Sequence, residues 1–107
     1  MGLSDVHRID IVAKDTKTGH ILLVIIAVGD WSKDENMLTQ LNAKLSNYVL
    51  FIKSSNYKNQ FGETEASIQL TTTHEPTEEV RELVEEASSD AKIPIEIVLQ
   101  EQKNFFR

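Results

Sequence analysis

The other elements of this chain are arranged around residues 29–52, GDWSKDENMLTQLNAKLSNYVLFI. Apolar residues recur there at spacings of three and four, which predicts one long amphipathic helix. Its apolar stripe consists of Leu38, Leu41, Leu45, Tyr48 and Ile52, widened by Met37 and Val49. The polar residues that suit its solvated side are Asn36, Gln40, Lys44 and Asn47. About 20 residues at about 1.5 Å each would form a rod of roughly 30 Å, enough to cross a small domain.

The start of this helix is predicted from the residues that follow the tryptophan. Ser32 and Glu35 fit a capping box, in which the serine hydroxyl accepts from a first-turn N–H and the glutamate accepts from the serine N–H. Asp34 and Glu35 would lie near the positive end of the helix dipole. Toward the other end, Leu50 and Phe51 lie off the centre of the stripe. Either neighbouring loops cover them or they mark a contact surface, and coverage is favoured because single exposed apolar residues are common.

Length and composition bound the class of protein. The 107 residues suit a single domain, residues 1–107, which is large enough to bury a core without a metal or a disulfide. The absence of cysteine removes thiol nucleophiles and thiolate metal ligands. The first residues contain no apolar run, so we expect no signal peptide. The longest apolar run, Ile21 to Val28, is too short to span a bilayer. We therefore expect a cytoplasmic protein with no membrane partner.

The charge of the chain restricts its partners. The net charge is −6, from 17 acidic and 11 basic residues. The densest run of charge is acidic and contains Glu75, Glu78, Glu79, Glu82, Glu85 and Glu86. Nucleic-acid binders normally carry a basic patch, because contacts to phosphate supply much of the affinity. We therefore expect no nucleic-acid partner and, if there is a protein partner, a basic one. The simpler interpretation is that an acidic surface only keeps the protein in solution.

Four strands and a second helix are predicted around the long helix. Residues 7–13 and 20–28, joined by the turn at 15–19, predict an antiparallel hairpin. The polar segment 54–63 predicts a loop, and residues 64–73 predict the third strand. Two further elements complete the chain: a helix that begins at Pro76 and stops at Ile93-Pro94, and a strand at residues 95–100. The order β-β-α-β-α-β predicts an α+β fold, a four-stranded mixed sheet with two helices on one face.

The second strand, HILLVIIAV, is apolar on both of its faces, whereas one layer of helices covers only one face. The other face could meet a loop, the C-terminal tail with Phe105 and Phe106, or a second subunit. On the third strand, Ser67, Gln69 and Thr71 share one face. Their hydroxyl and amide groups suit a solvated face or a binding surface, and the solvated face is the favoured interpretation.

Motifs that carry catalysis are missing from the sequence. It contains no GxGxxG, no phosphate-binding loop and no GxSxG elbow. His74-Glu75 begins like a zinc-protease motif, but Glu78 stands where the second histidine is required. A metal or acid–base site could form if strand-end histidines shared one edge of the sheet, although solvated histidines are the more frequent outcome. The residues concerned are His7, His20, His74, Asp5 and Asp10. We predict no catalytic residue, no metal and no cofactor.

Asp30-Trp31, at the junction of a strand and a helix, is the most specific pair in the chain. A tryptophan there buries much area while its indole N–H requires an acceptor, which Asp30 could supply. This structural role is favoured for Trp31. The alternative is a patch of aromatic and acidic residues that binds a partner. The predicted binding residues are Asp30, Trp31, Tyr48, Tyr57, Phe61, Glu78 and Glu82.

The hairpin RIDIVAKDTKTGHILLVI, the Asp-Trp pair and the segment LNAKLSNYVLFIKS resemble a small bacterial family of uncharacterised domains. The residues that carry the resemblance are Asp30, Trp31, Lys44, Leu45, Tyr48, Phe51, Ile52 and Ser54. The chain differs in having Ser55 where a glycine is usual, which puts the end of the helix in question. The likeness covers most of the chain and is specific in its first half. It implies a bacterial, cytoplasmic, free-standing domain with no established activity.

Three functional hypotheses follow. The first is a non-enzymatic protein-binding module, either regulatory or an immunity-type protein that masks a basic toxin or nuclease with its acidic helix. The second is a homo-oligomeric small-molecule binder or weak enzyme, with a site on the open sheet face near Ser67, Gln69 and Thr71. The third is a structural homodimer that pairs through the apolar second strand.

Overall fold

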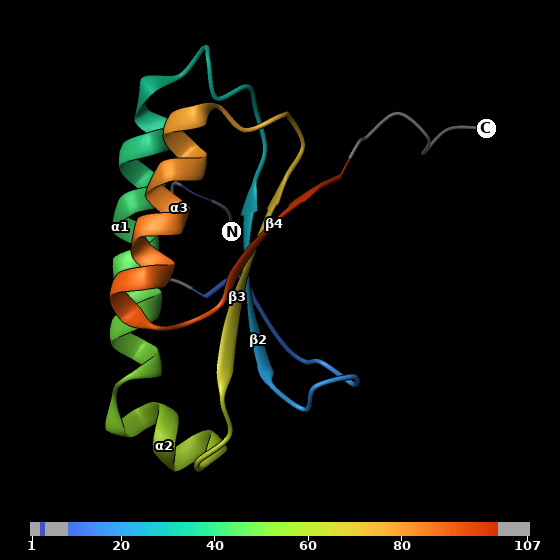
Figure 1. The fold of residues 1–107 in the computed structure, drawn as a ribbon, viewed down its shortest axis with the longest axis vertical. Helices are drawn as coiled ribbons and strands as arrows, with labels where there is room; N and C mark the ends of the chain where they lie inside the picture. The colour runs from blue at the N-terminus through green and yellow to red at the C-terminus, as the bar shows by residue number, and fades with distance from the viewer. Residues whose placement is uncertain (1–2, 4–8, 101–107) are drawn as a thin grey trace, which may run out of the picture.

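A computed structural model describes residue 3 and residues 9–100, which form a layer of helices on a layer of strands (Figure 1). In this part of the chain the elements are β1 (Ile11–Lys14), β2 (Ile21–Ala27), α1 (Glu35–Ile52), α2 (Ser55–Phe61), β3 (Ala66–Thr72), α3 (Glu78–Ala91) and β4 (Ile95–Leu99). The strand order is β1-β2-β3-β4, with β1 antiparallel to β2 and the other neighbours parallel. The predicted α+β fold with a four-stranded mixed sheet is confirmed, and α2 is an additional helix.

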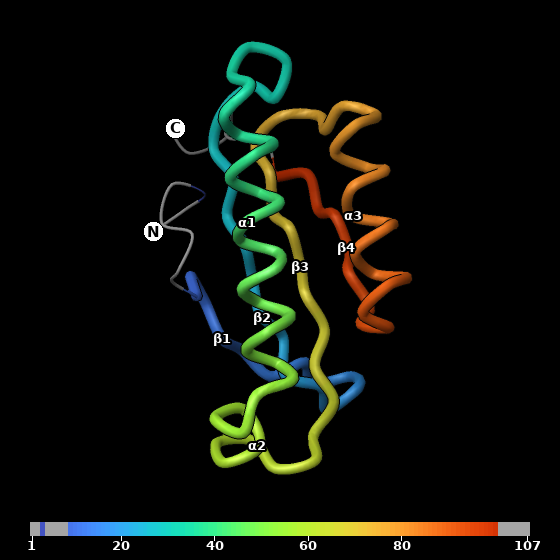
Figure 2. Tube along the Cα trace, turned by 90° about the vertical axis from the view of Figure 1, so that its left-hand side faces the viewer, coloured from blue at the N-terminus to red at the C-terminus, as the bar shows by residue number. Residues whose placement is uncertain are grey.

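The core lies between the sheet and the two long helices, which run side by side on one face (Figures 1 and 2). Alternate residues of β2 and β3 point toward the helices, as the pleat of a strand requires. The fully shielded side chains there include Leu23, Ile25, Ile68, Leu70, Leu41, Leu45 and Val80. Burial of each aliphatic side chain is worth about 1.5–3 kcal/mol, so this layer holds the helices on the sheet.

No described helix covers the opposite face of the sheet (Figure 1). Leu22 and Ile26 of β2 lie on this face and are half-buried, and Thr71 of β3 is Ile26's neighbour across the ladder. What completes this face stays a prediction, because Phe105 and Phe106 lie outside the described residues. The first strand is shorter than predicted: it begins at Ile11, and His7 and Arg8 also lie outside the described residues.

The predicted capping box at the start of α1 is wrong. Asp34 is the N-cap, and its side chain accepts from the Asn36 N–H at 3.0 Å. The Ser32 hydroxyl instead donates to Asp30 Oδ1 at 2.8 Å. The reason is a turn that precedes the helix, closed by the Lys33 N–H donating to the Asp30 carbonyl at 3.0 Å. This turn uses Ser32 before the first helical residue is reached.

The predicted loop at 54–63 is also wrong, because residues 55–61 form α2. Ser54 caps this helix by accepting from the Tyr57 N–H at 3.2 Å. Gly62 ends it with a φ of 67°, a conformation that glycine adopts without steric cost. The polar composition of the segment concealed the helix, since only Tyr57 is buried in it.

Candidate functional site

Trp31 lies between β2 and α1, and its side chain is buried. Its side chain is 6% exposed, and its indole N–H donates to Thr72 Oγ1 at 2.8 Å. The tryptophan therefore ties the junction of β2 and α1 to the end of β3, where the Thr72 hydroxyl in turn donates to the His74 carbonyl at 2.9 Å. The acceptor is therefore Thr72 and not Asp30. Hydrogen bonds from the hydroxyl and the N–H of Ser32 hold the pKa of Asp30 below its ordinary value.

Two tyrosines of the predicted binding patch are also buried. The Tyr48 hydroxyl donates to the Val24 carbonyl and accepts from the Asp10 N–H, both at 2.9 Å. The Tyr57 hydroxyl donates to the Thr64 carbonyl at 2.7 Å. Burial raises the pKa of both tyrosines, and the pKa of Tyr48 lies far above its ordinary value. Their polar ends are thus occupied within the fold.

The structure brings only part of the predicted aromatic set together. The ring of Tyr57 lies 4.9 Å from that of half-buried Phe61 and 5.7 Å, edge-on, from that of Phe51. Trp31 precedes α1 whereas Tyr57 follows it, so the full length of that helix separates them (Figure 2). The shielded rings pack within the fold. A role of these residues in binding stays a prediction.

Lys44 was expected on the solvated side of the helix, and this expectation is wrong. Its Nζ lies 2.8 Å from Asp10 Oδ1, and both side chains have 0% exposure. The other oxygen of Asp10 accepts from the Ile26 N–H at 3.0 Å. Sequence patterns do not reveal this pair, because the two residues are 34 positions apart and no local spacing connects them.

The expected meeting of histidines does not occur between the two that the structure describes. His20 precedes β2 and His74 follows β3, and these strands are parallel, so the two residues lie at opposite ends of the sheet. His7 and Asp5 lie outside the described residues. Within residues 3 and 9–100, no three His, Asp or Glu side chains gather closely enough to hold a metal ion.

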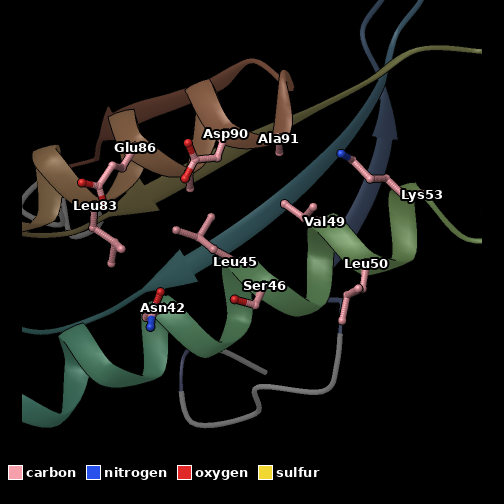
Figure 3. A pocket seen from close by; sticks show the side chains of 11 residues that line it. Asn42, Leu45, Ser46, Val49, Leu50, Lys53, Leu83, Glu86, Asp90 and Ala91 are labelled. Carbon is pink, nitrogen blue, oxygen red and sulfur yellow. The ribbon is translucent and has the colours of Figure 1, made fainter.

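The candidate site is a groove of about 490 Å³ between α1 and α3 (Figure 3). Its floor consists of buried and half-buried apolar residues: Leu45, Val49, Leu83, Ala87 and Ala91. Two of these five are alanines, whose small side chains leave the space between the helices unfilled. Leu50 also lines the groove and is 68% exposed, so the described loops do not cover it as expected.

The rim of the groove differs between its two sides. On α1 it carries the short, uncharged side chains of Asn42 and Ser46, with Lys53 at one end. On α3 it carries the carboxylates of Glu86 and Asp90 (Figure 3). The α1 side of the rim is therefore uncharged except for Lys53 at its end, and the α3 side is negative.

The predicted binding residues Glu78 and Glu82 belong to the same acidic row. Glu78, Glu82, Glu86 and Asp90 follow one another at intervals of four residues along α3, and all four are exposed. No described residue forms an ion pair with any of them, whereas Arg81 pairs with Glu75 at 2.6 Å. Like charges four residues apart destabilise an isolated helix by about 0.2–0.5 kcal/mol per pair. We call these four residues the carboxylate row.

A second cavity, of about 340 Å³, lies on the open face of the sheet near the start of β3. It is lined by Ser67 and Gln69, which the sequence singled out, and by His20, Asp15 and Glu96. The amide nitrogen of Gln69 donates to Thr71 Oγ1 at 2.9 Å, which leaves its oxygen as an acceptor. The cavity therefore presents a mixture of polar donors and acceptors.

Comparison with known proteins finds a match to one protein family, and this match carries no known activity. The sequence model of a protein family described as "Family of unknown function (DUF6572)" matches residues 1–102. No curated protein and no solved structure matches the chain. Each helix in the described part of the chain is too short or too polar to cross a lipid bilayer.

Proposed function

The chain belongs to the family of unknown function DUF6572, and we propose that it is a non-enzymatic protein-binding module that holds a basic partner in the groove between α1 and α3. The observation that carries this proposal is the combination of an apolar floor with the carboxylate row along one side. Its concrete forms are an immunity-type protein that masks a basic toxin or nuclease, and a regulatory protein with a basic target. We place it in the cytoplasm of a bacterium.

The groove has the composition of a protein-binding surface. Leu50, Leu83 and Val49 supply apolar area that a partner would remove from water, worth about 25 cal/mol per Å². The carboxylate row would speed the encounter with a positively charged partner and reject acidic ones. Cationic groups of the partner would also reduce the repulsion between neighbouring carboxylates of the row. Binding would therefore relieve the destabilisation that this repulsion causes in the free helix.

The test is affinity capture from a lysate of the source cells, repeated at low and high salt. The proposal predicts one basic protein, retained at 1:1 stoichiometry and released by salt. The variant E82Q/E86Q/D90N should lose it, because the negative side of the groove becomes neutral. A matched variant, E65Q/E85Q/E96Q, removes three exposed carboxylates outside the groove and should retain it. Equal retention by both variants, or no basic protein with the unaltered chain, would refute the proposal.

Small-molecule binding by a homo-oligomer is a second candidate, and the cavity at Ser67 and Gln69 favours it. This function predicts a ligand that raises the melting temperature of the unaltered protein in a metabolite screen. The variant S67V/Q69L should abolish the shift, because it removes polar groups from the cavity wall. The groove variant E82Q/E86Q/D90N should leave it unchanged. The opposite pattern of sensitivity would assign the ligand to the groove.

A further inference from the structure

We infer that the partner segment in the groove is a basic amphipathic α-helix of about three turns, lying along α1 and α3. This inference rests on the proposed function and specifies the form of the partner. It follows from the length of the groove, from the chemistry of its walls and from the one-sided distribution of its charge.

The length of the groove limits the segment. Its lining runs from Asn42 to Lys53 on α1 and from Leu83 to Ala91 on α3 (Figure 3). At 1.5 Å per residue these stretches measure about 16 Å and about 12 Å. A helix has a pitch of about 5.4 Å, so two to three of its turns are in contact with the floor. Such a helix presents apolar side chains at positions i, i+4 and i+7.

The walls favour a helix over an extended segment. A bound strand needs neighbouring backbone N–H and C=O groups with which to pair. The lining residues here all belong to helices or directly follow one, and the backbone groups of helix interiors are already paired within the helix. A helical segment satisfies its own backbone and offers only side chains to the groove. Ser46, Ala87 and Ala91 are small, which permits the distance of about 8–10 Å between axes at which helices pack.

The charge distribution sets the polarity of the segment's sides. The flank that faces α3 meets Glu86 and Asp90, with Glu82 one helical turn further along the same row, and should carry Lys or Arg at matching intervals of four residues. The flank that faces α1 meets Asn42 and Ser46, with Lys53 at one end, and should be uncharged or polar. A second copy of this chain is a poor occupant, because its own carboxylate row would approach the first. Nucleic acids and anionic membranes are poor occupants for the same electrostatic reason.

The probe is a phage-displayed library of fully random 16-residue peptides, selected on the unaltered protein. The inference predicts enriched peptides with apolar residues at helical spacing and lysine or arginine along one flank. The best peptide, made synthetically, should gain helical circular dichroism on binding. Its affinity should fall at least tenfold in Ala87→Arg, which fills the floor, and in E82Q/E86Q/D90N. Ser46→Arg should also weaken binding of the peptide. Because Ser46 is at an exposed rim position, this variant is expected to fold even if Ala87→Arg does not.

Ala13→Arg is the matched control, because Ala13 is exposed on β1 and lies outside the groove. Its affinity for the peptide should equal that of the unaltered protein. Enrichment of acidic or aperiodic peptides, no enrichment, or binding that ignores the groove variants would overturn the inference. A cellular partner that depends on the carboxylate row but inserts a non-helical segment would overturn the helix and leave the proposed function intact. A cellular partner that ignores the row would refute the proposed function itself.

Discussion

The Nζ atom of Lys44 lies 2.8 Å from Oδ1 of Asp10, and neither side chain is exposed to solvent. Lys44 lies in α1, and Asp10 directly precedes β1. Asp10 also accepts from the Ile26 N–H of β2, and its own N–H donates to Tyr48 of α1. The ion pair therefore joins the long helix to the two strands at one side of the sheet.

Replacement of Lys44 should destabilise the protein strongly. Lys44→Met withdraws the cation from a buried carboxylate, and breaking such a pair costs about 3–5 kcal/mol. The double variant K44M/D10N should cost less than the sum of its single changes, because the two residues are coupled. Urea unfolding followed by circular dichroism measures both values. Lys17→Met, at an exposed turn, is the control, and a Lys44→Met cost below about 1 kcal/mol would contradict the role of the pair.

The two tyrosines should titrate at unusually high pH. Burial raises the pKa of Tyr48 and Tyr57 in the folded chain, whereas both should titrate near about pH 10 when it is unfolded. Their contribution to stability is complete below the unfolded pKa and is lost as pH rises toward the folded pKa, because the unfolded chain loses its protons first. Phenolate absorbance should therefore rise later in the native protein than in denaturant. Each of the two tyrosines contributes half of the phenolate absorbance. If half of this absorbance appears near about pH 10 under native conditions, one tyrosine is not buried as described.

The bond between Trp31 and Thr72 should contribute to stability. Trp31→Phe keeps most of the apolar contact but removes the indole N–H, which should cost about 1–3 kcal/mol. Thr72→Val removes the acceptor and also the bond to the His74 carbonyl, so it should cost at least as much. Thermal unfolding by circular dichroism measures both. If W31F/T72V costs the full sum of the single changes, the two side chains do not act through a shared bond.

The cap of α1 should reside in Asp34, while Ser32 acts on Asp30. Asp34→Ala should cost about 1 kcal/mol of stability, since it removes the acceptor for the Asn36 N–H. Ser32→Ala should leave the helix intact and raise the pKa of Asp30 toward its ordinary value, as NMR titration would show. The lowered pKa stabilises the fold above the ordinary pKa of aspartate, and this effect disappears as pH falls through the lowered value. If Ser32→Ala loses more stability than Asp34→Ala, the N-cap is Ser32, as the capping box with Glu35 predicts, and not Asp34.

Local patterns predict most of the architecture. The alternation in β3 and the three-to-four spacing in α1 and α3 each reflect burial of one side of an element, which leaves a periodic trace in the sequence. The strand β2 is instead recognised from its continuous apolar run. Local patterns miss α2 because its burial is limited to Tyr57, too little to produce a period. They misplace Lys44 because a lysine on a helix is normally solvated, and its partner comes from another part of the chain.

The groove was less predictable than the fold. The sequence singles out Glu78 and Glu82, and the structure shows that they begin a row whose later members line the groove. The gap itself depends on the spacing of α1 and α3, to which no local pattern refers. Ala87 and Ala91 look like ordinary small residues in the sequence, and the space beside them exists only because α1 lies opposite. Figure 3 shows this arrangement of the two helices.

The polar residues of β3 have a consequence for the behaviour of the protein at high concentration. On the face of the sheet opposite the helices, Gln69 and Thr71 lie beside Val24 and Ile26 of β2, and Thr71 also lies beside Val98 of β4. They separate Val24 and Ile26 from Val98, which interrupts the apolar surface across this part of the sheet. The row of hydroxyl and amide groups therefore limits the continuous apolar area that these strands could offer to a second molecule at high concentration.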